Sequence, residues 1–135
     1  MDKEKLKEKY TEYQVLIQQL QQIHQNIENI DKHIQDLKNL DENLSSITNI
    51  QTNQETLMAM GSGIFLKGVL KDNKNLIMNV GSNIYLEKTT DEARETLNRQ
   101  LSEVTVLSEQ MKEQVNILVN RIQELQQEFK QLKEE

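Results

Sequence analysis

Two similar stretches near the middle of the chain decide its fold: "LMAMGSGIFLK" spans residues 57–67 and "IMNVGSNIYLE" spans residues 77–87. In both stretches, apolar residues alternate with other residues on either side of a Gly-Ser turn. A period of two residues is typical of β-strands, and the glycines tolerate the backbone of a tight turn. The stretch "KDNKN" at residues 71–75 supplies a further turn between the two copies. The middle of the chain therefore predicts two β-hairpins with four strands.

The two predicted hairpins share an apolar face. The offset between the copies is twenty residues, an even number, so equivalent positions point to the same side of each hairpin. Two short hairpins cannot bury such a face alone, and their outer strands leave backbone groups unpaired. We therefore expect the hairpins to assemble between subunits into a barrel or a stacked sheet. The residues expected at this assembly surface are Met58, Met60, Ile64, Leu66, Met78, Val80, Ile84 and Leu86.

The residues before the hairpins have the pattern of a long helix. The 135-residue chain contains no proline, cysteine or tryptophan, and 28% of its residues are charged. Apolar residues recur in steps of three and four, which predicts a coiled-coil seam. Ser, Thr and Asn gather near residue 50, where we expect the helix to end. The predicted seam residues are Leu6, Tyr10, Tyr13, Ile17, Leu20, Ile23, Ile27, Ile30, Ile34, Leu37, Leu40, Leu44 and Ile47.

A second long helix is expected after the hairpins. Thr89 stands three residues before Glu92, which is the spacing of a capping box at a helix start. The seam that follows alternates steps of four and three, with one polar member, Ser108, whose role the pattern leaves open. Its residues are Leu101, Val104, Ser108, Met111, Val115, Leu118, Ile122, Leu125, Phe129 and Leu132.

The two arms have nearly equal lengths, roughly 70 Å each at 1.5 Å per residue. Equal arms joined by a reversal favour an antiparallel coiled-coil hairpin, and the alternative is that each arm pairs with another chain. The expected fold is therefore α+β and mainly α, in one unit over residues 1–135. Its arms are residues 1–50 and 89–135, and the hairpins occupy residues 51–88.

Composition and motifs argue against several classes of function. The formal net charge of −6 disfavours nucleic-acid binding, because phosphate contacts need a basic surface. No apolar run is long enough to span a membrane and "MDKEKLKEKY" lacks a signal-peptide core, so we expect a cytoplasmic protein. His24 and His33 have no partner at ligand spacing, and Gly61-Ser62-Gly63 lacks the lysine of a phosphate loop. We expect no enzyme activity, no cofactor and no metal.

The chain resembles the alpha class of the prefoldin family over essentially its whole length. The likeness is carried by the paired "MGSGIFLKG" and "VGSNIYLEK" hairpins between two coiled-coil arms, and by "KTTDEA", which opens the second arm. Two hairpins rather than one point to the alpha class. At residues 58–60 the chain has Met-Ala-Met where a proline-containing stretch is expected in the family, which predicts a more regular first strand.

The resemblance implies an ATP-independent holdase. Two alpha-class chains, one of them a second copy of this chain, and four beta-class chains would join their hairpins into a β-barrel platform. The tips of six coiled coils would then capture unfolded proteins and deliver them to a group II chaperonin. Carried onto this sequence, the client-binding tip comprises Leu6, Tyr10, Tyr13, Leu125, Phe129 and Leu132.

Two alternatives remain at this stage. The tip residues also suit a simple continuation of the seam, which is the more ordinary state for Leu6 and Leu125, whereas Tyr10, Tyr13 and Phe129 favour a function because aromatics are uncommon in seams. For the whole chain, the rival function is a structural coiled-coil tether whose tips bind one folded partner.

Overall fold

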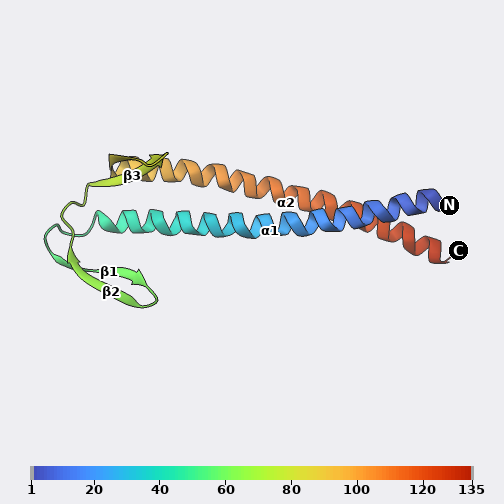
Figure 1. The fold of residues 1–135 in the computed structure, drawn as a ribbon, viewed down its shortest axis with the longest axis horizontal. Coiled ribbons are helices and arrows are strands. Elements are labelled where there is room, and N and C mark those ends of the chain that lie inside the picture. Colours follow the sequence, from blue (N-terminus) through green and yellow to red (C-terminus); the bar gives the residue numbers. More distant parts are fainter. Residues whose placement is uncertain (1, 135) are drawn as a thin grey trace. The chain divides into compact units, whose positions relative to one another are not determined.

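The computed structural model describes residues 2–134 and contains two long helices with two β-hairpins between them in the chain (Figure 1). The mainly helical α+β fold and the four expected strands are confirmed. In chain order the elements are α1 (Lys3–Ile47), β1 (Glu55–Gly61), β2 (Ile64–Val69), β3 (Asn75–Gly81), β4 (Ile84–Thr89) and α2 (Thr90–Glu134).

Each hairpin forms its own two-stranded antiparallel sheet, and the repeat in sequence is also a repeat in register. Met58 lies opposite Leu66 in the first hairpin, and Met78 lies opposite Leu86 in the second. Among the described residues, neither sheet pairs with a further strand. A single chain thus contains the strands and their free edges but no barrel, whose closure requires other chains.

The two hairpin turns have the same backbone conformation. Ser62-Gly63 and Ser82-Asn83 have positive φ angles at both central positions, which a type I′ hairpin turn requires. In both hairpins the register shifts just before the turn, between residues 59 and 61 and between residues 79 and 81. The first and third strands therefore share the same irregularity, because both bulge at the residue before the turn glycine.

The ends of the helices follow from their local side chains. Near the end of α1, the hydroxyl groups of Ser46 and Thr48 donate to the carbonyl oxygens of Glu42 and Ser45 at 3.0 and 2.7 Å. Such hydroxyls compete for the backbone groups of the last turn, which explains why α1 ends close to the expected residue 50.

The predicted cap at the start of α2 is also confirmed. The backbone N–H of Glu92 donates to Thr89 Oγ1 at 3.1 Å, and the Thr89 hydroxyl donates to the Glu92 carboxylate at 3.2 Å. One of the unpaired amide groups in the first turn of the helix is satisfied in this way.

The linker between the hairpins is fastened to the start of α2. Asp72 Oδ1 accepts the backbone N–H groups of Lys74 and Asn75 at 2.8 and 3.1 Å, which lowers the pKa of the Asp72 carboxyl. The buried Thr90 donates its backbone N–H and its hydroxyl to the Lys74 carbonyl at 2.8 and 3.1 Å. The residues of "KDNKN" thus form the predicted turn and also hold the second hairpin to the helix.

The chain divides into two parts, and in each of them α1 contacts α2. The first part comprises residues 2–34 and 103–134, and the second comprises residues 35–102. In the first part, Arg121 binds Glu12 and Lys9 binds Glu128, which orients the helices antiparallel. In the second part, Arg94 Nε donates to Asp41 Oδ1 at 3.1 Å. The two arms therefore pair within one chain.

The seam of α2 follows the expected pattern, and all ten predicted positions are buried or half-buried. Of the predicted seam positions of α1, Leu6 and Tyr10 near the start of the helix and Leu40 near its end are exposed. Leu40 is 44% exposed, and its neighbour Asp41 is half-buried beside Arg94. With Asp41 in place of Leu40, the steps of four and three alternate without interruption through Leu37 and Leu44. Both of these leucines are buried. The phase of the helix, and not the polarity of one residue, determines which side faces the partner.

The polar seam residue Ser108 has a clear role in the first part. Its side chain is 3% exposed, and its hydroxyl donates to Asp31 Oδ1 at 3.1 Å. The same carboxylate oxygen lies 3.9 Å from the Lys112 amino group. Ser108 therefore joins the two helices by a hydrogen bond at a position where an apolar residue would only pack.

Candidate functional site

An aromatic cluster lies at the arm end, which we define as residues 2–13 of α1 and 121–134 of α2. The ring centroids of Tyr10 and Tyr13 are 6.4 Å apart, and each lies 5.8 Å from the centroid of Phe129. Tyr10 and Tyr13 are one helical turn apart on α1, and the antiparallel pairing brings Phe129 of α2 against them. Tilted rings at these distances attract one another beyond simple burial.

The aromatic cluster borders a hollow of about 580 Å³, which we call the arm-end hollow. Five of the six residues predicted for the tip line it, and Tyr10 remains 55% exposed despite its two ring contacts. The sixth, Leu125, is 0% exposed and packs in the seam. The lining residues are Leu6, Tyr10, Tyr13, Gln126, Phe129, Lys130, Leu132 and Lys133.

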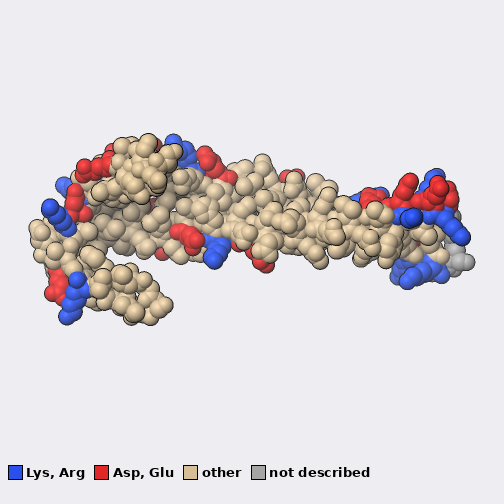
Figure 2. Space-filling model, in the orientation of Figure 1, with Lys and Arg blue, Asp and Glu red and all other residues tan. Residues whose placement is uncertain are grey.

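Ion pairs hold the two helices together beside this hollow. The Arg121 guanidinium donates to both carboxylate oxygens of Glu12, at 2.8 and 3.1 Å, and also to Glu124 at 3.0 Å. These bonds lower the pKa of the Glu12 carboxyl and raise the pKa of Arg121. A further pair joins Lys9 to Glu128. Figure 2 shows acidic and basic side chains gathered at this end.

The hairpins present the second group of predicted residues. Seven of the eight residues expected at the assembly surface are exposed, and Met78 is half-buried. Sequence reasoning missed that the opposite faces of the hairpins are also apolar. The strict alternation places Leu57 and Phe65 on that other face, which was the available signal. The additional exposed residues are Leu57, Phe65, Val69, Ile77 and Tyr85.

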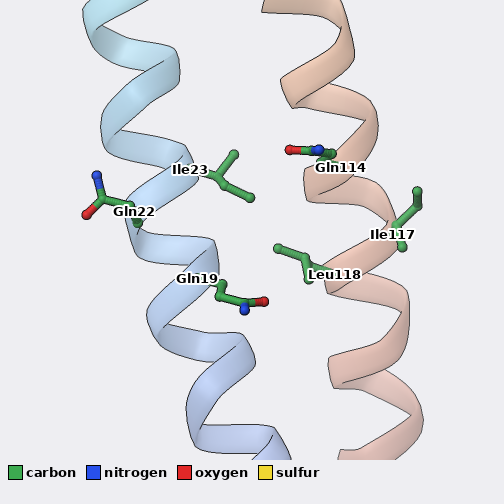
Figure 3. Close-up of a pocket in the computed structure, with 6 residues that line it drawn as sticks. All are labelled: Gln19, Gln22, Ile23, Gln114, Ile117 and Leu118. Atoms are coloured by element: carbon green, nitrogen blue, oxygen red, sulfur yellow. The ribbon is translucent and has the colours of Figure 1, made fainter.

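A second hollow, of about 390 Å³, lies in the middle of the first part and is called here the mid-arm hollow. Figure 3 shows Ile23 and Leu118 pointing toward each other from the two helices, while Ile117 points away from α1. The other residues that line the mid-arm hollow carry amide groups: Gln19, Gln22 and Gln114. The mid-arm hollow has neither the aromatic rings nor the charged groups of the arm-end hollow.

Catalytic and metal chemistry find no support in the part of the chain that the structure describes. Among the side chains that the structure describes, no three of His, Cys, Asp or Glu gather in a way that could hold a metal ion. Within the same residues, neither helix has an apolar stretch long enough to cross a membrane.

Comparison with known proteins decides the family. The family described as "Prefoldin subunit" matches residues 16–135 of the chain. The chain belongs to the prefoldin subunit family. Among solved structures, filamentous PFD from Methanocaldococcus jannaschii superimposes with a TM-score of 0.72 at 19% identity. The superposition covers 85% of this chain and 95% of that one and supports the prefoldin fold.

Curated relatives place this prefoldin subunit in the alpha class. It is 28% identical over 115 residues to prefoldin subunit alpha of Thermofilum pendens, covering 85% of this chain and 89% of that protein. It is 36% identical over 94 residues to prefoldin subunit alpha of Pyrococcus horikoshii, covering 68% and 63% of the two chains. Prefoldin subunit alpha 1 of Thermococcus kodakarensis is 30% identical over 102 residues, covering 76% and 70%.

The family membership determines the broad class of function. Prefoldin is a family of chaperones and not of enzymes, so this prefoldin subunit is a chaperone subunit. The expectation of no enzyme activity is confirmed on that ground. The residues that contact clients and the residues that contact other subunits remain predictions.

Proposed function

We propose that this prefoldin subunit holds unfolded polypeptides without nucleotide by binding their apolar segments in the arm-end hollow. The observation that carries the proposal is the aromatic cluster at the end of the helix pair, in which Tyr10 is exposed and Tyr13 and Phe129 are half-buried. Aromatic side chains offer large apolar contact areas at a low entropic cost. An open hollow lined by rings and leucines suits many apolar segments and selects no single folded surface.

Weak binding at one hollow suffices when several arms act together. Binding by a second arm becomes intramolecular after the first, so total avidity exceeds the affinity of each contact. We propose that the hairpins supply this multivalency by joining two copies of the chain with four beta-class subunits in a β-barrel platform. Free strand edges and exposed apolar side chains on both faces of each hairpin support an assembly of this kind.

The assembled particle would act in the cytoplasm and pass its clients to a group II chaperonin. Transfer to a second chaperone is consistent with a hollow that is open and shallow, because weakly held segments dissociate readily. Nothing in the transfer requires a nucleotide site on this chain.

Suppression of aggregation tests the proposal. The chain, assembled with a beta-class partner, is added without ATP to several unrelated proteins diluted from denaturant, and light scattering is recorded. We expect the double variant Tyr10→Ser/Phe129→Ser to need roughly tenfold more complex for equal suppression, since truncating central aromatic contacts commonly costs that much affinity.

The matched control is Val106→Ser, which removes an apolar side chain that is exposed away from the hollow. Native mass spectrometry checks that all variants assemble as the unmodified chain does. Equal suppression by the arm-end variant and the unmodified complex counts against the hollow as the client site. If the unmodified complex assembles but protects none of the proteins, the tether function is favoured.

A further inference from the structure

The arm-end hollow is basic, although the chain as a whole is acidic. Besides its apolar residues, it is lined by Gln126 and by two basic residues, Lys130 and Lys133. No described carboxylate lines it. Both lysines are exposed, and neither forms an ion pair with a described residue. The two positive charges are therefore available to a bound ligand.

Three carboxylates of the arm end are engaged with other cations. Glu12 and Glu124 both bind Arg121, and Glu128 binds Lys9. These three acidic groups thus bind cations other than the two lysines of the hollow, and Arg121 serves two of them.

The acidic residues at the start of α1 are also directed elsewhere. Asp2 accepts the backbone N–H of Glu4 at 3.4 Å at the helix start. Glu4 and Glu8 line a separate surface depression together with Lys7 and Thr11. They do not line the arm-end hollow.

We propose that the arm-end hollow prefers unfolded segments in which apolar residues are interspersed with Asp or Glu. This inference rests on the proposed function and specifies the class of segment that is bound. The apolar side chains of the segment contact the aromatic cluster, and its carboxylates reach Lys130 and Lys133 at the rim. Two exposed ion pairs supply roughly a two- to tenfold preference over a neutral segment.

Labelled peptides test the preference directly. Three peptides of equal length carry identical apolar residues separated by Glu, by Ser or by Lys, and their binding to the assembled complex is measured by fluorescence anisotropy. We expect the Glu peptide to bind roughly two- to tenfold more tightly than the Ser peptide, and the Lys peptide to bind more weakly than either. The preference should disappear near 1 M salt, where the screening length falls to about 3 Å.

Two charge variants locate the effect. Lys130→Gln/Lys133→Gln should bind the Glu and Ser peptides equally. The matched control Lys5→Gln/Lys7→Gln removes the same charge from the arm end at residues that do not line the hollow, and it should keep the preference. A lysine in the last turn of α2 also stabilises the helix end, but that role does not distinguish one peptide from another.

Each outcome has a distinct meaning. Equal binding of the Glu and Ser peptides to the unmodified complex overturns the inference. The inference also fails if Lys5→Gln/Lys7→Gln loses the preference for the Glu peptide as fully as Lys130→Gln/Lys133→Gln does. The proposed function is judged separately, by whether binding of the Ser peptide depends on Tyr10 and Phe129. If no peptide binds, both proposals fail.

Discussion

On α1, the charged Asp41 faces the partner helix and the apolar Leu40 faces solvent. Leu40 and Asp41 are neighbours, and polarity alone assigns Leu40 to the seam. The structure reverses this assignment, because Asp41 binds Arg94 and Leu40 faces solvent. The side that α1 presents is determined by the position of α2, which no window of local sequence contains. Leu125 is a similar case, since its exposure depends on how closely the helices approach.

Substitutions at two leucines test this assignment. Leu44→Ala removes a buried side chain and should lower the free energy of unfolding by about 2–4 kcal/mol. Leu40→Ala changes an exposed side chain and should alter it by less than about 0.5 kcal/mol. Denaturant unfolding followed by circular dichroism measures both free energies. If the two variants lose equal stability, Leu40 is a seam residue after all.

At the level of elements, the hairpins were predictable in detail. The two-residue period and the Gly-Ser turns are local features, and the structure has the four strands in identical registers. The start of α2 was predictable for the same reason, because a capping box spans only a few residues. The apolar second face was less evident, because its apolar residues alternate in a set that also contains the charged Lys67 and Glu87.

The glycines before the turns provide a test at this level. Gly61 and Gly81 have φ angles of 113° and 121°, which residues with a side chain rarely adopt. Gly61→Ala/Gly81→Ala should therefore destabilise each hairpin by at least about 1 kcal/mol and weaken assembly with a beta-class partner.

The control for these glycines is Asn83→Gly, at a position whose φ of 60° glycine adopts without strain. It should assemble as well as the unmodified chain. Native mass spectrometry over a dilution series compares the variants, and assembly of the double alanine variant at unchanged concentration would show that the hairpins do not form the platform.

For the whole molecule, the structure supports a division of labour between the two parts of the chain. The second part carries the strands with free edges, and the first carries the aromatic cluster at the arm end. The fold class, the arms and five of the eight residues that line the hollow could be predicted from the sequence. The barrel could not be observed in one chain, because its closing partners are other subunits. The basic lining of the hollow was also hidden, since it depends on which carboxylates are engaged elsewhere.

Site-specific photocrosslinking shows whether clients are held at the arm-end hollow. A photoreactive amino acid is placed at Tyr10 or, as the matched control, at Val106, which are 55% and 52% exposed. Each complex is illuminated with a client diluted from denaturant. We predict that the client crosslinks predominantly to position 10. Equal crosslinking at both positions, or crosslinking at position 106 alone, would show that clients are not held at the arm-end hollow.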